Sequence, residues 1–89
     1  MSTDTIDLGT LGKRLARVRR AYGERIDLPK LGRTGFASLL GVSAAAYASY
    51  EHGAAEPTVA FLVALRNKTQ ISLDWLLDPN QPGRNRQFR

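Results

Sequence analysis

A three-residue turn, Gly41-Val42-Ser43, separates two short segments whose apolar residues recur at helical spacing. Glycine adopts at low cost the left-handed backbone conformation that ends a helix. A serine hydroxyl accepts a backbone N–H from the first turn of the helix that follows it. The sequence therefore predicts one helix that ends at Gly41 and a second that begins after Ser43, and helices joined this tightly must cross at a steep angle.

Small and apolar side chains surround the turn at the spacing that two crossing helices require. Ala37 supplies a small side chain where the second helix passes close to the first. The positions expected to face inward are all apolar or aromatic: Phe36, Leu40, Val42, Tyr47 and Tyr50. These residues predict a helix, a turn and a helix across residues 33–53.

Helical patterns flank this unit on both sides. From Thr10 the apolar residues form one stripe of an amphipathic helix, which Gly23 is expected to end. Residues 24–32 are expected to form a loop, because a proline and a glycine interrupt them. Thr58 and Ser72 are suited to cap two further helices. With no strand pattern beside them, these segments predict an all-α, compact five-helix fold.

The chain is long enough for one domain. Its 89 residues leave no room for a second hydrophobic core. We expect a polar N-terminal lead-in over residues 1–9 and a folded domain over residues 10–78. Residues 79–89 have the composition of a flexible basic tail, with arginines at three positions: Arg84, Arg86 and Arg89.

Composition and charge narrow the function classes. Thirteen lysines and arginines against eight acidic residues give a net charge of +5, and eight of the thirteen precede Thr34, which favours a polyanionic partner.

The absence of cysteine excludes disulfides and thiolate metal sites. No apolar run reaches the ~20 residues that span a bilayer, and the polar start is unlike a signal peptide, so a cytoplasmic location is expected. His52 is not accompanied by a cysteine or an acidic cluster that could complete a metal site. It also cannot form a catalytic triad with Glu51 and Ser49, because neighbouring positions on a helix point in different directions. We expect no enzyme activity, no cofactor and no small-molecule ligand.

Two stretches of sequence resemble a known family of DNA-binding proteins. The run from Phe36 to Gly53 reads FASLLGVSAAAYASYEHG, and the run from Ser72 to Leu77 reads SLDWLL. Together they resemble the lambda-repressor-like, Cro and XRE family of helix-turn-helix regulators, over about residues 10–78. The resemblance implies a five-helix bundle that binds double-stranded DNA, usually as a homodimer, with the second helix of the motif in the major groove.

The resemblance also implies roles for individual residues. Arg33 and Thr34 would contact phosphates at the start of the first motif helix, and Lys30 in the preceding loop is a second phosphate candidate. The positions that would face the base edges are Ser43, Ala44, Ala45 and Ser49.

Other positions are implied to be structural. Arg19 and Glu51 correspond to an ion pair that ties the first helix to the recognition helix. Tyr47 and Tyr50 fall on positions that the family buries, so we interpret them as core residues rather than as platforms for base stacking.

The base-facing positions carry alanine and serine, where such proteins normally carry Gln, Arg, Asn or Lys. Alanine offers only a methyl group to a base, so binding would depend on phosphate contacts and DNA shape. The main hypothesis is a transcriptional repressor of phage or bacterial type. The alternative is a helix-turn-helix domain that acts as a protein–protein interaction module, with the alanine face as its docking surface.

Two further expectations concern exposure. The basic residues of the first helix other than Arg19 are expected to be solvated: Lys13, Arg14, Arg17 and Arg20. Trp75, Leu76 and Leu77 form a large apolar group on a very short helix, so at least one is expected to lie exposed in a dimer interface. The alternative is that Trp75 caps the core.

Overall fold

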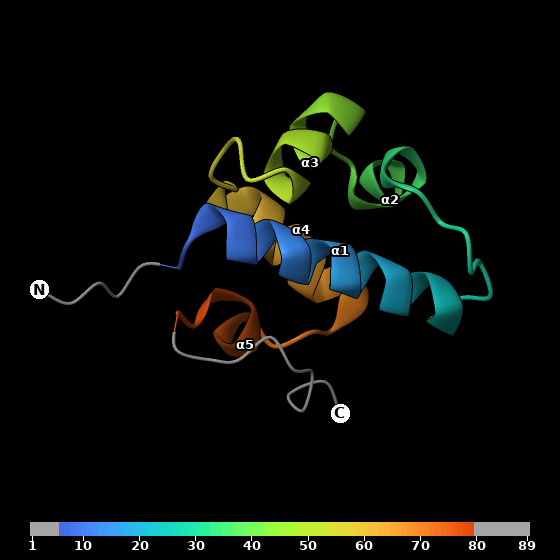
Figure 1. Cartoon of the computed structure of the whole chain (residues 1–89). Coiled ribbons are helices and arrows are strands. Elements are labelled where there is room, and N and C mark those ends of the chain that lie inside the picture. The colour runs from blue at the N-terminus through green and yellow to red at the C-terminus, as the bar shows by residue number, and fades with distance from the viewer. Residues whose placement is uncertain (1–5, 80–89) are drawn as a thin grey trace, which may run out of the picture.

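The computed structural model describes residues 6–79 of the chain, which form five helices and no strand (Figure 1). The predicted all-α, five-helix fold is confirmed. No helix in this range is both long and apolar enough to cross a membrane. The elements in chain order are α1 (Leu8–Arg25), α2 (Arg33–Leu40), α3 (Ala44–Glu51), α4 (Val59–Thr69) and α5 (Leu73–Leu77).

Short polar side chains begin four of the five helices. The Asp7 carboxylate accepts from the Thr10 N–H at 3.0 Å, and the Ser43 hydroxyl accepts from the Ala46 N–H at the same distance. Thr58 and Ser72 cap α4 and α5 in the same way, through the N–H of the third residue after each. The three hydroxyl caps were evident from the sequence, because an N-cap is a local interaction.

Helix α1 is longer than the apolar stripe predicted. It begins at Leu8, and Ile6 before it is already buried, so residues 6–9 belong to the fold rather than to a polar lead-in. It also continues past Gly23 to Arg25. A Cβ on Gly23 would lie 2.6 Å from the carbonyl oxygen of Leu28. Gly23 therefore does not end the helix, contrary to the expectation from the sequence. Glycine is needed here because the following loop folds back onto the helix and leaves no room for a Cβ.

The core is built around α1, with aromatic side chains from the other helices. The Phe36 and Tyr47 rings meet edge to face with 5.4 Å between centroids, and Tyr47 lies 6.0 Å from Phe61. All three side chains are at most 2% exposed, and such aromatic pairs add stability beyond their buried area. Tyr50 is half-buried against the Phe61 ring. The interpretation of both tyrosines as core residues agrees with these positions.

The short helix α5 buries most of its apolar group. Trp75 and Leu76 are 1% and 0% exposed, so neither is available at the surface for a dimer interface. Leu77 remains half-buried. The expectation that at least one of the three would lie exposed did not take into account that α5 packs across α1, which covers its apolar side chains.

Arg14 is buried rather than solvated, contrary to expectation. Its side chain is 3% exposed, and its Nη1 donates to the carbonyl oxygens of Trp75, Leu76 and Asp78 at 2.7, 3.1 and 2.9 Å. The last carbonyls of a helix have no partner within the helix, and a cation at this end also complements the helix dipole. Burial lowers the pKa of the guanidinium, while the Asp78 carboxylate opposes that shift. Arg14 therefore anchors the end of α5 to the middle of α1.

Replacing Arg14 by methionine is expected to lower the free energy of unfolding by about 2–4 kcal/mol, since hydrogen bonds to a charged group contribute roughly 1.5–3 kcal/mol. Lys13→Met changes the same charge at an exposed neighbouring position and should have an effect within about 0.5 kcal/mol. Urea unfolding of both variants measures the difference. Equal midpoints would show that the carbonyl contacts of Arg14 contribute nothing to stability.

Candidate nucleic-acid interface

The turn between α2 and α3 has the geometry that its sequence predicted. Gly41 takes a left-handed conformation with φ of +76°. The Val42 N–H donates to the carbonyl of Ala37 at 3.0 Å, which closes the end of α2, and the Ser43 cap then begins α3. Both helices lie on the side of α1 opposite α5 (Figure 1). The motif therefore forms one face of the molecule.

The outer face of α3 carries only small side chains. Ser43, Ala44 and Ala45 are exposed, while Tyr47 on the opposite face is completely buried. Ser49 is half-buried, and its hydroxyl donates to the Ala46 carbonyl at 2.8 Å. Both serine hydroxyls thus bond within their own helix. This face presents methyl groups and a short polar edge that a backbone or a base can approach closely.

The start of α2 differs from the other helix starts. Gly32 occupies the N-cap position and makes no side-chain hydrogen bond to the helix. The first N–H groups of a helix need external acceptors, and its dipole favours negative charge there. Arg33 and Thr34 are exposed in this first turn, and Lys30 is exposed in the loop just before it. The phosphate candidates from the sequence therefore lie together at one helix end.

Glu51, at the end of α3, is the centre of a buried polar network. Its side chain is only 4% exposed, and Arg19 donates to it from Nε at 2.7 Å and from Nη2 at 3.3 Å. The Tyr47 hydroxyl donates to the same carboxylate. The hydrogen bond that Arg19 donates to Glu51 raises the pKa of Arg19, and burial raises the pKa of Tyr47. The ion pair that the resemblance implied therefore joins α1 to α3.

A second cation shares this carboxylate. Arg33 Nη1 lies 3.7 Å from Glu51 Oε1, and the Arg33 side chain is 46% exposed. Arg19, by contrast, is 14% exposed and also donates to the Leu31 carbonyl at 3.0 Å. One negative charge thus faces two guanidinium groups. The excess positive charge lies on the more exposed arginine, at the start of α2.

A close backbone contact, which was not predicted from the sequence, holds α3 in place. A Cβ on Gly12 would lie 2.2 Å from the Glu51 carbonyl oxygen, which is backbone and cannot move aside. Gly53 follows α3 with φ of +74°, and a Cβ there would lie 3.2 Å from the Cα of Gly9. The spacing of Gly9 and Gly12, three residues apart on one helix face, was the signal available in the sequence.

The match to a known family coincides with this face. A family model described as helix-turn-helix matches residues 30–76, from the loop before α2 into α5 and just over half of the chain. No curated protein and no solved structure gives a significant match to the chain. The family match agrees with the resemblance of the sequence to the XRE and lambda-repressor-like proteins. It also agrees with the five helices and with the left-handed turn at Gly41. The chain belongs to the XRE and lambda-repressor-like family of helix-turn-helix regulators.

Proposed function

We propose that this protein is a cytoplasmic transcriptional repressor that binds double-stranded DNA as a homodimer, with α3 in the major groove. The observation that carries the proposal is that one helix-turn-helix unit combines an uncapped, basic start of α2 with an exposed, small-residue start of α3. A phosphate at α2 and base edges at α3 fit the docking geometry of this motif. Two copies, about one DNA turn apart, would supply the specificity that one motif lacks.

Phosphate contacts supply most of the binding in this proposal. Arg33 offers an exposed guanidinium to a phosphate while Glu51 restrains its other side, and Lys30 adds a second cation. On α3, Ala44 and Ala45 offer methyl groups for contact with thymine methyls. Affinity would then depend steeply on salt, and discrimination between sequences would come mainly from DNA shape.

Two variants separate these contributions. Arg33→Ala is expected to weaken binding to a preferred and a scrambled duplex about equally, and to reduce the slope of log K against log salt by about one. Ala45→Gln adds a side chain that pairs with adenine, and is expected to change which duplex is preferred by about 1–3 kcal/mol. Fluorescence anisotropy at several salt concentrations measures both effects, with exposed Lys68→Ala on α4 as the charge-matched control.

The opposite pattern would contradict this account. If Arg33→Ala leaves binding unchanged while Ala45→Gln abolishes a highly selective interaction, the alanines themselves are the specificity surface.

The same alanine face supports a second candidate function. Ala44 and Ala45 are exposed and carry no group that reads a base, and small side chains allow a partner helix to approach closely. In this alternative the motif is a protein–protein interaction module. A low DNA affinity that does not change with salt would favour it over the repressor.

A further inference from the structure

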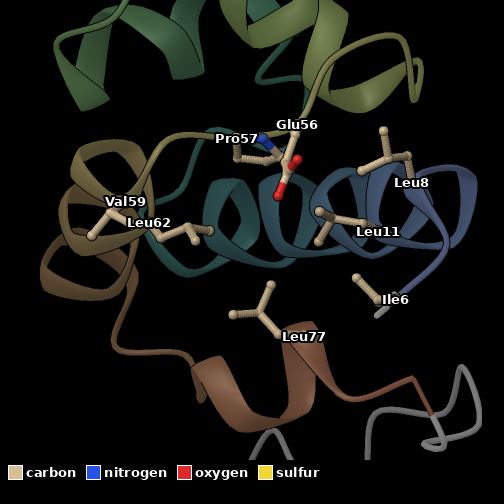
Figure 2. Close-up of a pocket in the computed structure, with 8 residues that line it drawn as sticks. All are labelled: Ile6, Leu8, Leu11, Glu56, Pro57, Val59, Leu62 and Leu77. Atoms are coloured by element: carbon tan, nitrogen blue, oxygen red, sulfur yellow. The ribbon is translucent and has the colours of Figure 1, made fainter. Parts of the chain in front are cut away.

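An apolar groove of about 490 Å³ opens at the end of the molecule where α1 begins (Figure 2). Three helices contribute to it: the start of α1, the start of α4 and the end of α5. The apolar side chains that matter here are Leu8, Leu11, Val59, Leu62 and Leu77. Val59 is 76% exposed at the edge of this groove. A concave, mainly apolar groove is a candidate binding site.

One acidic residue lines the groove. Glu56 comes from the loop between α3 and α4, and its carboxylate extends toward the apolar side chains in Figure 2. It forms no ion pair with any other residue between positions 6 and 79. A suitable occupant therefore combines an apolar side chain with positive charge.

The sequence beyond Pro79 has this combination. Residues 80–89 lie outside the described residues; they carry three arginines and no acidic residue, and their one large apolar side chain is Phe88. Residues 1–5, at the other end, include Asp4 and no basic side chain, so their charge does not complement Glu56. We propose that residues 84–89 bind in this groove of their own chain, with Phe88 among the apolar side chains and an arginine paired with Glu56.

The chain has enough length for this contact. Leu77 lines the groove, and Pro79 follows it by two residues. From Pro79 to Phe88 an extended chain spans up to about 30 Å, at roughly 3.3 Å per residue. Because the segment is tethered, its effective concentration at the groove is on the order of millimolar. Half occupancy then requires an intrinsic Kd of only about 1 mM, and the buried ring of Phe88 is the main contribution to it.

A spin label tests the proposal in the full chain. The protein has no cysteine, so Gln87→Cys provides a single labelling position next to Phe88. A nitroxide there is expected to broaden the methyl NMR signals of Val59 and Leu62. The signals of Leu39, on the outer side of α2, should remain sharp. Adding Phe88→Ala should reduce docking on the order of tenfold or more, and Glu56→Lys should reduce it further as the charge reverses.

Three results would overturn the proposal. The first is the absence of broadening at Val59 and Leu62. The second is broadening that persists unchanged with Phe88→Ala, since a non-specific encounter does not depend on that ring. The third is broadening that appears when isotope-labelled, unmodified protein is mixed with spin-labelled protein of natural isotope abundance. That result would assign the contact to two copies of the chain.

Discussion

Glu51→Ala is expected to lower the free energy of unfolding by about 3 kcal/mol, within the range for breaking a buried ion pair. The substitution leaves Arg19, which is 14% exposed, without its carboxylate, and leaves the buried Tyr47 hydroxyl with only the long 3.4 Å contact to the Leu15 carbonyl. It also removes the contact that restrains Arg33. Because part of Arg19 still reaches water, the loss should fall at the lower end of that range.

Glu56 provides the matched control for this prediction. It carries the same side chain in an exposed loop after α3, so Glu56→Ala should change stability by no more than about 0.5 kcal/mol. Urea unfolding of both variants gives the comparison through the midpoints at constant slope. Glu51→Gln retains one carbonyl acceptor and should fall between wild type and Glu51→Ala. Equal midpoints for Glu51→Ala and Glu56→Ala would contradict the prediction.

Gly12→Ala is expected to lower the free energy of unfolding, although the same substitution usually raises it within a helix. At an exposed position inside a helix, replacing glycine with alanine stabilises by about 0.5–1 kcal/mol. Here the added Cβ would come within 2.2 Å of the Glu51 carbonyl oxygen, so α1 and α3 must separate. Overpacking of this kind costs about 1–3 kcal/mol, and the ion pair carried by Glu51 moves with its backbone. We expect a net loss of about 3 kcal/mol.

Gly35→Ala distinguishes this effect from helix propensity. Gly35 is also inside a helix, and its nearest neighbour for an added Cβ is the Leu31 Cδ1 atom at 3.1 Å, the end of a flexible side chain. This variant should be neutral or slightly stabilised. Thermal unfolding of the two variants under identical conditions measures the contrast. A Gly12→Ala protein as stable as Gly35→Ala would show that α1 and α3 separate without cost.

Local signals account for what the sequence predicted well. The end of α2 at Gly41 and the hydroxyl caps at Ser43, Thr58 and Ser72 depend on residues within one helical turn. The position of Arg19 opposite Glu51 came from the family resemblance, because spacing alone does not bring residues of two helices together.

The features that were missed depend on contacts between distant segments. Arg14 looks like any arginine on an amphipathic helix, and only the path of α5 brings three carbonyls to it. Gly23 looks like a helix end, and only the loop backbone that approaches it explains why it lies inside α1; likewise, only the packing of α3 brings its backbone onto Gly12. The burial of Trp75 and Leu76 likewise follows from where α5 docks.

The backbone contact at Gly12 has a mechanical consequence for the proposed complex with DNA. Together with the Arg19–Glu51 pair and the hydrogen bond from the Tyr47 hydroxyl to Glu51, it holds α3 closely against α1. Tilting α3 relative to α1, to follow a groove of different width, would break these contacts. The duplex must then bend or twist to fit, and the free energy of deforming the DNA becomes part of the binding free energy. Operators would be ranked partly by how easily they deform, at positions that no side chain touches.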